Sequence, residues 1–229
     1  MRFRVVAFDL DGTLYPNNSF YIQLVPFLLR ELNYLRVFGK ARDRLRQEDA
    51  TGLCNRTESF YKTQAQYMSE ILKADPVLLE EKTEKLIYRG WEPLFKKVKL
   101  FPHVTETLAF LREKGIKLAL LSDFPPETKL ENLGLAGFWD AVLCSEAIGR
   151  LKPDPASFFE LIRVMDCPPD EILYVGNSFS YDVLGAQKTG MKAAWIRPKT
   201  AYFFPNKKKE RKADFVFFDY RQLIKFVLT

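Results

Sequence analysis

Short apolar runs recur along this chain of 229 residues, and they lack the polar alternation of a half-exposed strand. Uninterrupted apolar runs of this length are typical of strands buried on both faces of a parallel sheet. We therefore predict strands over residues 3–8, 116–121, 141–144, 172–175, 193–196 and 215–218.

Helical patterns separate most of these runs. One covers residues 105–114 and stops at Gly115, a second covers 155–165, and a third runs over 182–189 to Gly190. A glycine directly after a periodic apolar stretch is a common helix end. Alternation of strands and helices in this order predicts an α/β fold with a doubly wound parallel sheet.

Residues 16–97 break this alternation. They offer helical stretches over 19–38, 57–73 and 76–89, without a convincing strand, and Asp75-Pro76 is a typical helix start. The sequence therefore predicts an α/β core made of residues 1–15 and 98–229, with an all-helical insertion at 16–97.

Composition narrows the class of protein. An apolar content of 47% with 28% charged residues is ordinary for a globular enzyme. The cysteines at 54, 144 and 167 are far apart, odd in number and form no CxxC pair, so a reduced, cytoplasmic setting is expected. The apolar stretch 20–29 is too short to span a bilayer, and we expect no membrane partner.

The net charge of +6 is concentrated in two basic stretches, residues 40–46 and 207–212. Such stretches attract anions or merely form solvated surface. For 207–212 we favour the surface interpretation, and for 40–46 both remain open because this stretch lies in the insertion. A nucleic acid polymer is not an expected partner.

Polar side chains follow four of the predicted strands. Asp9 and Asp11 end the first, Ser122 and Asp123 the second, Lys152 follows the third, and the fourth leads to Asn177 and Asp182. Ligands of open α/β sheets bind at the carboxyl ends of the strands. Two carboxylates about 4 Å apart repel each other by about 4 kcal/mol at an effective dielectric constant near 20. The pair Asp9 and Asp11 therefore indicates a metal ion, a shared proton, or a reaction that uses both groups.

Each of these residues also has an ordinary structural explanation. Asp-x-Asp-Gly suits a turn, Ser122, Asp123 and Ser178 suit helix caps, and Lys152 suits an exposed surface. Their ordered occurrence at strand ends is what favours a functional rim. His103 is the only histidine, which excludes a multi-histidine metal site, and no GxGxxG or Walker-type loop is present.

The ordered set resembles the motifs of the haloacid dehalogenase-like (HAD) hydrolase superfamily, most closely its phosphatases with a helical cap after the first motif. The four motifs are Asp9-Leu10-Asp11-Gly12-Thr13, Leu121-Ser122-Asp123, Lys152-Pro153-Asp154-Pro155, and Val175-Gly176-Asn177-Ser178 with Asp182. The similarity covers the first strand and nearly everything from Leu100 onward, and the insertion matches only as a helical cap in the expected place.

The resemblance implies a Mg²⁺-dependent phosphatase that hydrolyses a small phosphomonoester, a sugar phosphate or a nucleotide. Asp9 would be the nucleophile that forms an aspartyl-phosphate, and Asp11 the general acid and base. Ser122 and Lys152 would bind the phosphoryl group. The metal would be held at Asp9, Asp11, Asn177 and Asp182, with Asp11 contributing its backbone carbonyl.

Asn177 departs from the family pattern, because phosphatases of this family usually carry an aspartate there. An amide still offers an oxygen to Mg²⁺ but removes one negative charge, so we expect weaker metal binding. Asp182 would then act beside the metal or move inward. A neutral residue is common in the family at the position of Asp123. Asp123 either caps the segment that opens at Pro125-Pro126 or discourages certain anionic groups, and both interpretations remain open.

Two other functions are weighed against the phosphatase. A catalytically weakened phosphate-binding or regulatory protein on the same fold is supported by Asn177 alone. A 2-haloacid dehalogenase is disfavoured by Asp11, because those enzymes lack an acid there. The sequence leaves the substrate and the oligomeric state open.

Substrate selection is expected in the cap. Its aromatic residues either line the substrate space or pack the cap core, and its arginines are candidates for a second anionic group of the substrate. Leu14-Tyr15-Pro16 is similar to family members that act on nucleotides. The aromatic candidates are Phe20, Tyr21, Phe60, Tyr61 and Tyr67, and the arginines are Arg42, Arg44, Arg46 and Arg56.

Overall fold

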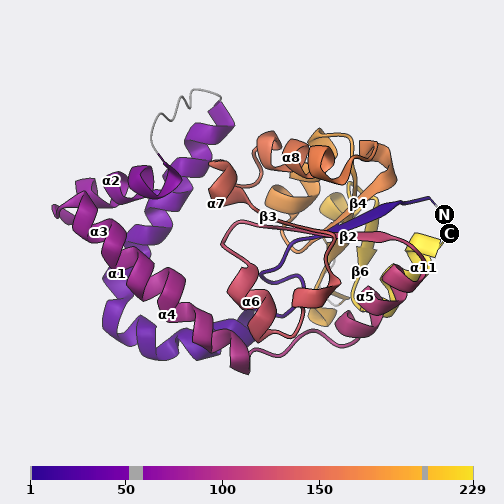
Figure 1. Ribbon diagram of the computed structural model, residues 1–229, viewed down its shortest axis with the longest axis horizontal. Helices are drawn as coiled ribbons and strands as arrows, with labels where there is room; N and C mark the ends of the chain where they lie inside the picture. The colour runs from indigo at the N-terminus through magenta and orange to yellow at the C-terminus, as the bar shows by residue number, and fades with distance from the viewer. Residues whose placement is uncertain (1, 52–58, 203–205, 229) are drawn as a thin grey trace.

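The central feature of the fold is one parallel sheet. The computed structural model describes residues 2–51, 59–202 and 206–228. Within them, six strands form a sheet in the order β3-β2-β1-β4-β5-β6, and every neighbouring pair is parallel (Figure 1). The strands are β1 (Val5–Phe8), β2 (Lys117–Ser122), β3 (Ala141–Cys144), β4 (Ile172–Gly176), β5 (Lys192–Ile196) and β6 (Phe215–Phe217). The six predicted strands are confirmed, with small shifts at their ends.

Helices cover both faces of this sheet, as the absence of polar alternation predicts. Val6 and Phe8 of β1 pack with α5 (Val104–Glu113) and α11 (Tyr220–Leu228) in one apolar cluster. Val5 and Ala7 face the other way and join α8 (Pro155–Met165) and α9 (Leu184–Lys188) in a second cluster. Figure 1 shows α8 on one side of the sheet and α5 and α11 on the other. The doubly wound α/β class is therefore confirmed.

Shorter helical segments complete this part of the chain. The α-helices are α6 (Glu127–Asn132), α7 (Ser145–Ile148) and α10 (Lys207–Glu210). The 3₁₀ turns are η3 (Ala136–Phe138), η4 (Pro169–Glu171) and η6 (Lys199–Tyr202), and η5 (Phe179–Val183) is a π-helical turn. The predicted helix 182–189 thus begins inside η5 and continues as α9.

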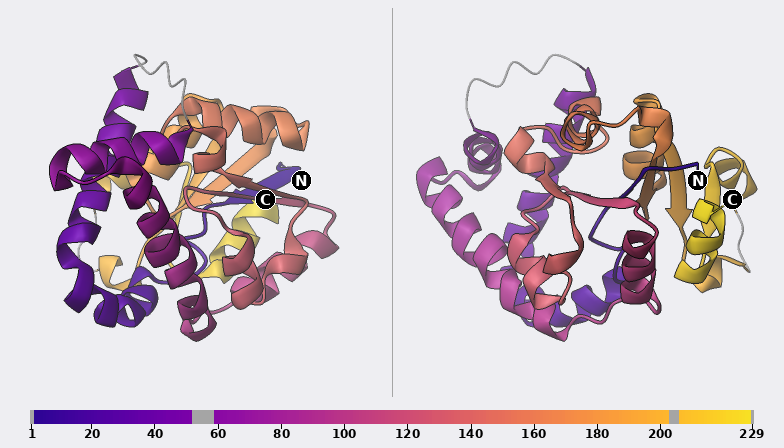
Figure 2. Two further views of the ribbon diagram at one scale, coloured as in Figure 1. Left: turned by 60° about the vertical axis from the view of Figure 1, so that its left-hand side comes forward. Right: turned by 45° about the vertical axis from the view of Figure 1, so that its right-hand side comes forward.

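In the described part of residues 17–97, between β1 and α5, every element is helical. They are α1 (Asn17–Thr51), α2 (Phe60–Leu72), α3 (Pro76–Thr83), the π-helical turn η1 (Glu84–Tyr88), α4 (Arg89–Trp91) and the 3₁₀ helix η2 (Glu92–Lys97). These helices stand together beside the sheet in both views of Figure 2. They share a buried apolar cluster that includes Phe38, Met68 and Ile87. As predicted, Asp75 caps α3, because its carboxylate accepts a hydrogen bond from Val77 N at 2.8 Å.

The helix predicted over 19–38 is longer in the structure. Helix α1 runs on to Thr51, with Pro26 inside it and a break in helical geometry at Glu31 (φ −123°). Its second half is stabilised by tertiary contacts, since Ala41 and Leu45 are buried. Residues 57–58 of the helix predicted over 57–73, like Cys54 and Arg56, lie outside the described residues. None of the described helices is both long and apolar enough to cross a bilayer.

Candidate active site

The register of the sheet brings the first and fourth motifs together. Phe8 pairs with Leu120 of β2 on one side and with Val175 of β4 on the other. Asp9, the next residue, donates its backbone N–H to the carbonyl of Val175 at 2.9 Å. Asp9 therefore lies between the ends of β2 and β4, at the carboxyl edge of the sheet.

The side chain of Asp9 is held from two sides. Thr13 Oγ1 donates to Asp9 Oδ2 at 2.7 Å, and Lys152 Nζ donates to Asp9 Oδ1 at 2.7 Å. Lys152 Nζ also donates to Asp182 Oδ1 at 2.8 Å and to the Tyr174 hydroxyl at 3.1 Å. All of these residues are buried. One ammonium group thus bridges the carboxylates of the first and fourth motifs.

Burial and charge shift the pKa values of this pair. Burial raises the pKa of Asp9 to about 7; the charge of Lys152 opposes this rise, and the charges of Asp182 and Asp11 add to it. Burial alone would lower the pKa of Lys152, but the carboxylates of Asp182 and Asp9 raise it above its ordinary value. Lys152 is therefore a permanent cation at this edge of the sheet.

Two glycines, Gly12 and Gly176, allow close packing within and between the first and fourth motif loops. Gly12 has φ +84°, and a Cβ there would lie 2.1 Å from Nδ2 of Asn177. The Asn177 amide therefore packs directly against the first motif. A Cβ on Gly176 would lie 2.2 Å from Cβ of Asp182, whose Oδ2 accepts from Ser178 N at 2.8 Å. Asp182 thus holds both the fourth motif loop and Lys152.

Asp11 faces a different set of partners. Lys129 Nζ of α6 donates to both of its carboxylate oxygens at 2.9 Å, and the Tyr15 hydroxyl also donates to Oδ1. The side chain of Asp11 remains 30% exposed. Sequence reasoning gave no role to Lys129 or to Thr13 and treated Tyr15 only as a substrate cue. The one available signal for Lys129 is its position in the helix that follows the second motif.

Ser122 and Asp123 extend the site along the end of β2. Ser122 is buried, and its Oγ accepts a hydrogen bond from Phe124 N at 3.2 Å. Asp123 accepts from Lys152 N at 3.1 Å and from Arg46 Nη2 at 3.0 Å. Burial raises the pKa of Asp123, but Lys152, Arg46 and Arg42 outweigh it and lower the pKa overall. Asp123 therefore ties the third motif and α1 to the second motif, a role that neither sequence interpretation anticipated.

The arginines of α1 are engaged by carboxylates. Arg42 forms a buried ion pair with Glu146 of α7, and Arg46 pairs with Asp123. Asp49 completes this contact, accepting from Arg150 Nη1 at 3.2 Å and Leu151 N at 3.3 Å. Arg44 pairs with Glu48 and Glu70 on the surface. The basic stretch 40–46 thus joins α1 to α7 and to the end of β2.

A cavity of about 220 Å³ includes Lys129, the partner of Asp11, in its lining. Phe124, Pro125 and Lys129 bound it on one side. The helices between residues 17 and 97 contribute Tyr61, Glu84, Ile87, Tyr88, Arg89, Trp91, Glu92 and Phe95. Of the aromatic residues for which lining substrate space or packing the cap was left open, Tyr61 lines this cavity, whereas Phe20 stacks on Phe95 with ring centroids 4.7 Å apart.

The donors available for a metal ion are oxygens. In the described ranges, no group of three or more acidic, histidine or cysteine side chains is placed to hold one. Asp182 is occupied by Lys152 and Ser178, and the Asp11 carboxylate by Lys129. The side chain of Asn177 lies against Gly12, in the loop that follows Asp9, and a carboxylate with an amide oxygen suits Mg²⁺, which keeps several waters when bound. The residues present therefore fit a weakly held Mg²⁺.

A parallel α/β sheet with a buried aspartate and lysine at its carboxyl edge defines a hydrolase-type site of the HAD class. A family model described as haloacid dehalogenase-like hydrolase matches residues 3–190. The chain belongs to the haloacid dehalogenase-like hydrolase family, as its motifs predict.

Curated relatives in this family carry phosphatase names. The chain is 32% identical to glyceraldehyde 3-phosphate phosphatase of Methanothermobacter thermautotrophicus, over 84% of this chain and 85% of that protein. It is 26% identical to phosphoglycolate phosphatase of Haemophilus influenzae, over 97% of both chains.

Solved structures show the same fold. A HAD phosphatase from Thermococcus onnurineus superposes with a TM-score of 0.66 at 24% identity, covering 98% of this chain and 97% of that one. The L-2-haloacid dehalogenase RSc1362 superposes with a TM-score of 0.70 at 21% identity, covering 100% of both.

Proposed function

We propose that this hydrolase is a Mg²⁺-dependent phosphatase that cleaves a small phosphomonoester through an aspartyl-phosphate on Asp9. The observation that carries the proposal is the environment of Asp9, whose carboxylate lies buried between Thr13 and Lys152, one strand end away from Ser122. A carboxylate fixed beside a permanent cation suits attack on a phosphorus atom, since the cation offsets the charge of the phosphate. The names of the curated relatives support this class of substrate.

In the proposed reaction, a carboxylate oxygen of Asp9 forms a bond to phosphorus while the bond from phosphorus to the leaving oxygen breaks. Asp11 gives its proton to that leaving oxygen. It then takes a proton from the water that hydrolyses the aspartyl-phosphate, which releases inorganic phosphate and restores Asp9. Lys152 and Ser122 bind the oxygens of the phosphoryl group throughout.

Asp9, Asn177 and the backbone carbonyl of Asp11 would hold Mg²⁺, and Asp182 would position them through the fourth motif loop. Mg²⁺ bound there would neutralise part of the phosphate charge. The neutral amide of Asn177 supports a lower metal affinity than an aspartate would give.

We propose further that residues 16–97 form a cap over a core made of residues 1–15 and 98–229. The separate apolar cluster of the helical segment supports this division. The cavity beside Asp11 is small, about 220 Å³, which suits a leaving group the size of a short-chain metabolite.

Hydrolysis of p-nitrophenyl phosphate with and without Mg²⁺, compared between the wild type and Asp9→Asn, tests the proposal. Metal-dependent release of phosphate that Asp9→Asn abolishes is the expected result. Binding of a phosphate analogue without turnover would instead identify a phosphate-binding protein. Metal-independent chloride release from 2-chloropropionate would identify a dehalogenase.

A further inference from the structure

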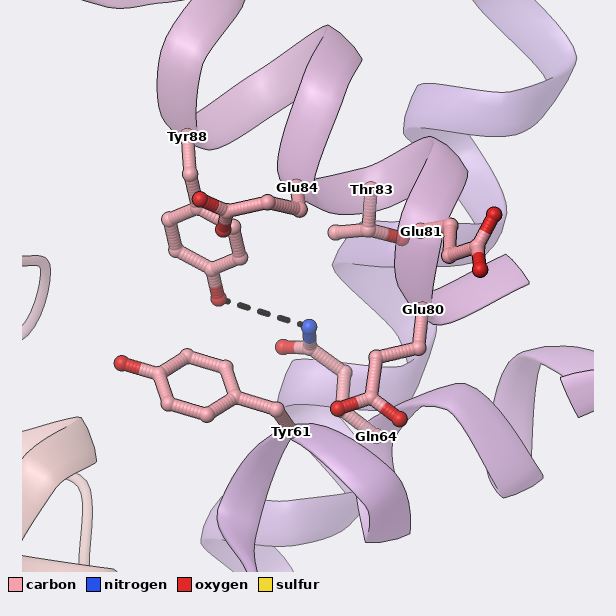
Figure 3. Close-up of a pocket in the computed structure, with 7 residues that line it drawn as sticks. All are labelled: Tyr61, Gln64, Glu80, Glu81, Thr83, Glu84 and Tyr88. Atoms are coloured by element: carbon pink, nitrogen blue, oxygen red, sulfur yellow. Dashed lines mark hydrogen bonds between the residues drawn. The ribbon is translucent and has the colours of Figure 1, made fainter. Parts of the chain in front are cut away.

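A second cavity lies wholly within the helical segment. Its volume is about 330 Å³, and its lining residues are Tyr61, Gln64, Glu80, Glu81, Thr83, Glu84 and Tyr88. Figure 3 shows Tyr61 and Gln64 of α2, Glu80 of α3 and Tyr88 of η1 around a common space, with the carboxylate of Glu81 turned away from it. Nothing in the proposed phosphatase reaction uses this cavity.

Gln64 presents an unpaired acceptor to the cavity. The residue is only 2% exposed, and its Nε2 donates to the Tyr88 hydroxyl at 3.4 Å. Its carbonyl oxygen Oε1 is buried and has no hydrogen-bond partner among the described residues. Figure 3 places this carboxamide between Tyr61 and Tyr88, inside the ring of lining residues. Because buried acceptors are almost always paired in folded proteins, the cavity calls for a ligand that donates a hydrogen bond.

The charge of the lining residues indicates that the hydrogen-bond donor of this ligand is a cation. Three of its lining residues are glutamates, Glu80 and Glu81 of α3 and Glu84 of η1, and none of the described lining residues is a lysine, arginine or histidine. Glu84 pairs with Arg89 at 2.8 Å. Glu80 and Glu81 have no ion-pair partner in the part of the chain that the structure describes. Like charges at i,i+4 destabilise a helix, so a cation in the cavity would relieve the repulsion between Glu80 and Glu84.

An organic cation fits better than a metal ion. The described carboxylates do not converge on a point where three of them could coordinate one ion. Two tyrosine rings line the same space, and aromatic faces attract ammonium groups. We propose that this cavity binds the ammonium group of an organic amine, with Gln64 Oε1 accepting one N–H and the glutamates balancing the charge.

The position of the cavity admits two sources for that amine. Tyr61, Glu84 and Tyr88 line both this cavity and the one that reaches Lys129 beside Asp11. The ammonium group belongs either to the distal end of the phosphorylated substrate or to a separate polyamine. The first source rests on the proposed function, whereas amine binding itself does not.

Calorimetric titration of the full chain with spermidine tests the binding. We expect saturable binding that 1,6-hexanediol does not reproduce, and the net charge of +6 argues against a general attraction of cations. Gln64→Met and Glu80→Gln should each weaken binding about tenfold, because each removes an interaction with a charged donor. Glu106→Gln makes the same charge change at an exposed position of α5 and should have no effect.

Because Gln64 is buried, the thermal stability of Gln64→Met is measured alongside its binding, and Glu80→Gln provides the second test if Gln64→Met does not fold. Absence of spermidine binding would overturn the proposal. So would binding that the diol matches, or binding that none of the cavity substitutions weakens.

Kinetics with 6-aminohexyl phosphate and 6-hydroxyhexyl phosphate then distinguish the two sources. A higher kcat/KM for the amino compound that disappears in Glu80→Gln assigns the amine to the substrate. Equal kcat/KM values, together with spermidine binding, assign it to a separate polyamine. Failure of p-nitrophenyl phosphate hydrolysis would refute the proposed function and leave the binding result standing.

Discussion

Lys129 Nζ lies 2.9 Å from both carboxylate oxygens of Asp11. The same ammonium group lies 5.0 Å from the ring centroid of Phe95 and 4.9 Å from that of Phe124. These contacts fix the direction of the Asp11 carboxylate at the mouth of the cavity between the helical segment and the core. Lys129 is therefore a positioning residue for the proposed general acid.

Lys129→Met tests this role through the leaving group. Protonation by a general acid matters most when the leaving alkoxide is a strong base. We expect kcat for an alkyl phosphate to fall about 100-fold, within the usual range for general acid catalysis, and kcat for p-nitrophenyl phosphate to fall much less. Steady-state kinetics on both substrates measure the difference, with the exposed Lys188→Met as the matched control. Equal losses on the two substrates would point to a merely structural role.

Asp9→Asn should abolish turnover and also change stability with a defined dependence on pH. The pKa of Asp9 is raised to about 7 in the folded protein. Between its ordinary value near 4 and this value, the folded state keeps a proton that the unfolded state releases, so stability falls as the pH rises through that window. In EDTA, the variant should be more stable than the wild type by about 2 kcal/mol at pH 8, with the gain shrinking towards pH 5.

Urea unfolding of both proteins at pH 5 and pH 8 measures this stability difference. A difference in unfolding free energy that is the same at both pH values would contradict the assigned direction of the Asp9 shift.

Asn177→Asp should strengthen metal binding. The substitution restores a carboxylate against the first motif loop, and ligand charge raises the affinity of oxygen sites for divalent cations. We expect the Mg²⁺ concentration for half-maximal activity to fall about tenfold, equivalent to 1.4 kcal/mol. Titration of activity with MgCl₂ provides the measurement, and Asn18→Asp adds the same charge at an exposed position. An unchanged Mg²⁺ requirement would place Asn177 outside the metal site.

Asp123→Asn should loosen the junction between α1 and the core. Asp123 accepts hydrogen bonds from Arg46 and from Lys152 N, and its pKa is lowered. A lowered folded pKa stabilises the protein above the ordinary value near 4 and loses this contribution as the pH falls below it. We expect a loss of about 2 kcal/mol at pH 7 that diminishes towards pH 3.

Thermal and urea unfolding across this pH range measure the loss. Asp43, which is 66% exposed and lies 3.6 Å from Arg46, offers a control, and Asp43→Asn should cost less than about 0.5 kcal/mol. If the two substitutions cost the same, the buried contact of Asp123 would not be the source of the stability.

Much of the fold follows from local pattern. The apolar runs identified the six strands because a sheet covered on both faces leaves no position for polar alternation. The first helical stretch of the insertion was predicted over residues 19–38, whereas α1 runs on to Thr51. It continues because Arg42 and Arg46 meet Glu146 and Asp123, partners that are 104 and 77 residues away in the chain. Pairing between residues so far apart in the chain cannot be predicted from the local periodicity of apolar residues.

Some residues of the candidate site could likewise be predicted from the sequence, and others could not. Strand ends converge on one edge of a parallel sheet, so the positions of Asp9, Ser122 and Asn177 could be predicted from the order of strands alone. Lys129 sits within a helix, where any lysine has the pattern of a surface residue. Its contact with Asp11 depends on how α6 packs against the first motif, which the sequence does not display.

The central claim is that Asp9 becomes phosphorylated during turnover. Mass spectrometry of the enzyme quenched during hydrolysis of a phosphomonoester with Mg²⁺, after borohydride reduction of acyl phosphates, tests it most directly. The account predicts a reduced residue at position 9 that depends on substrate and is absent from Asp9→Asn. An unmodified Asp9 in an enzyme that is turning over, with turnover preserved in Asp9→Asn, would contradict it.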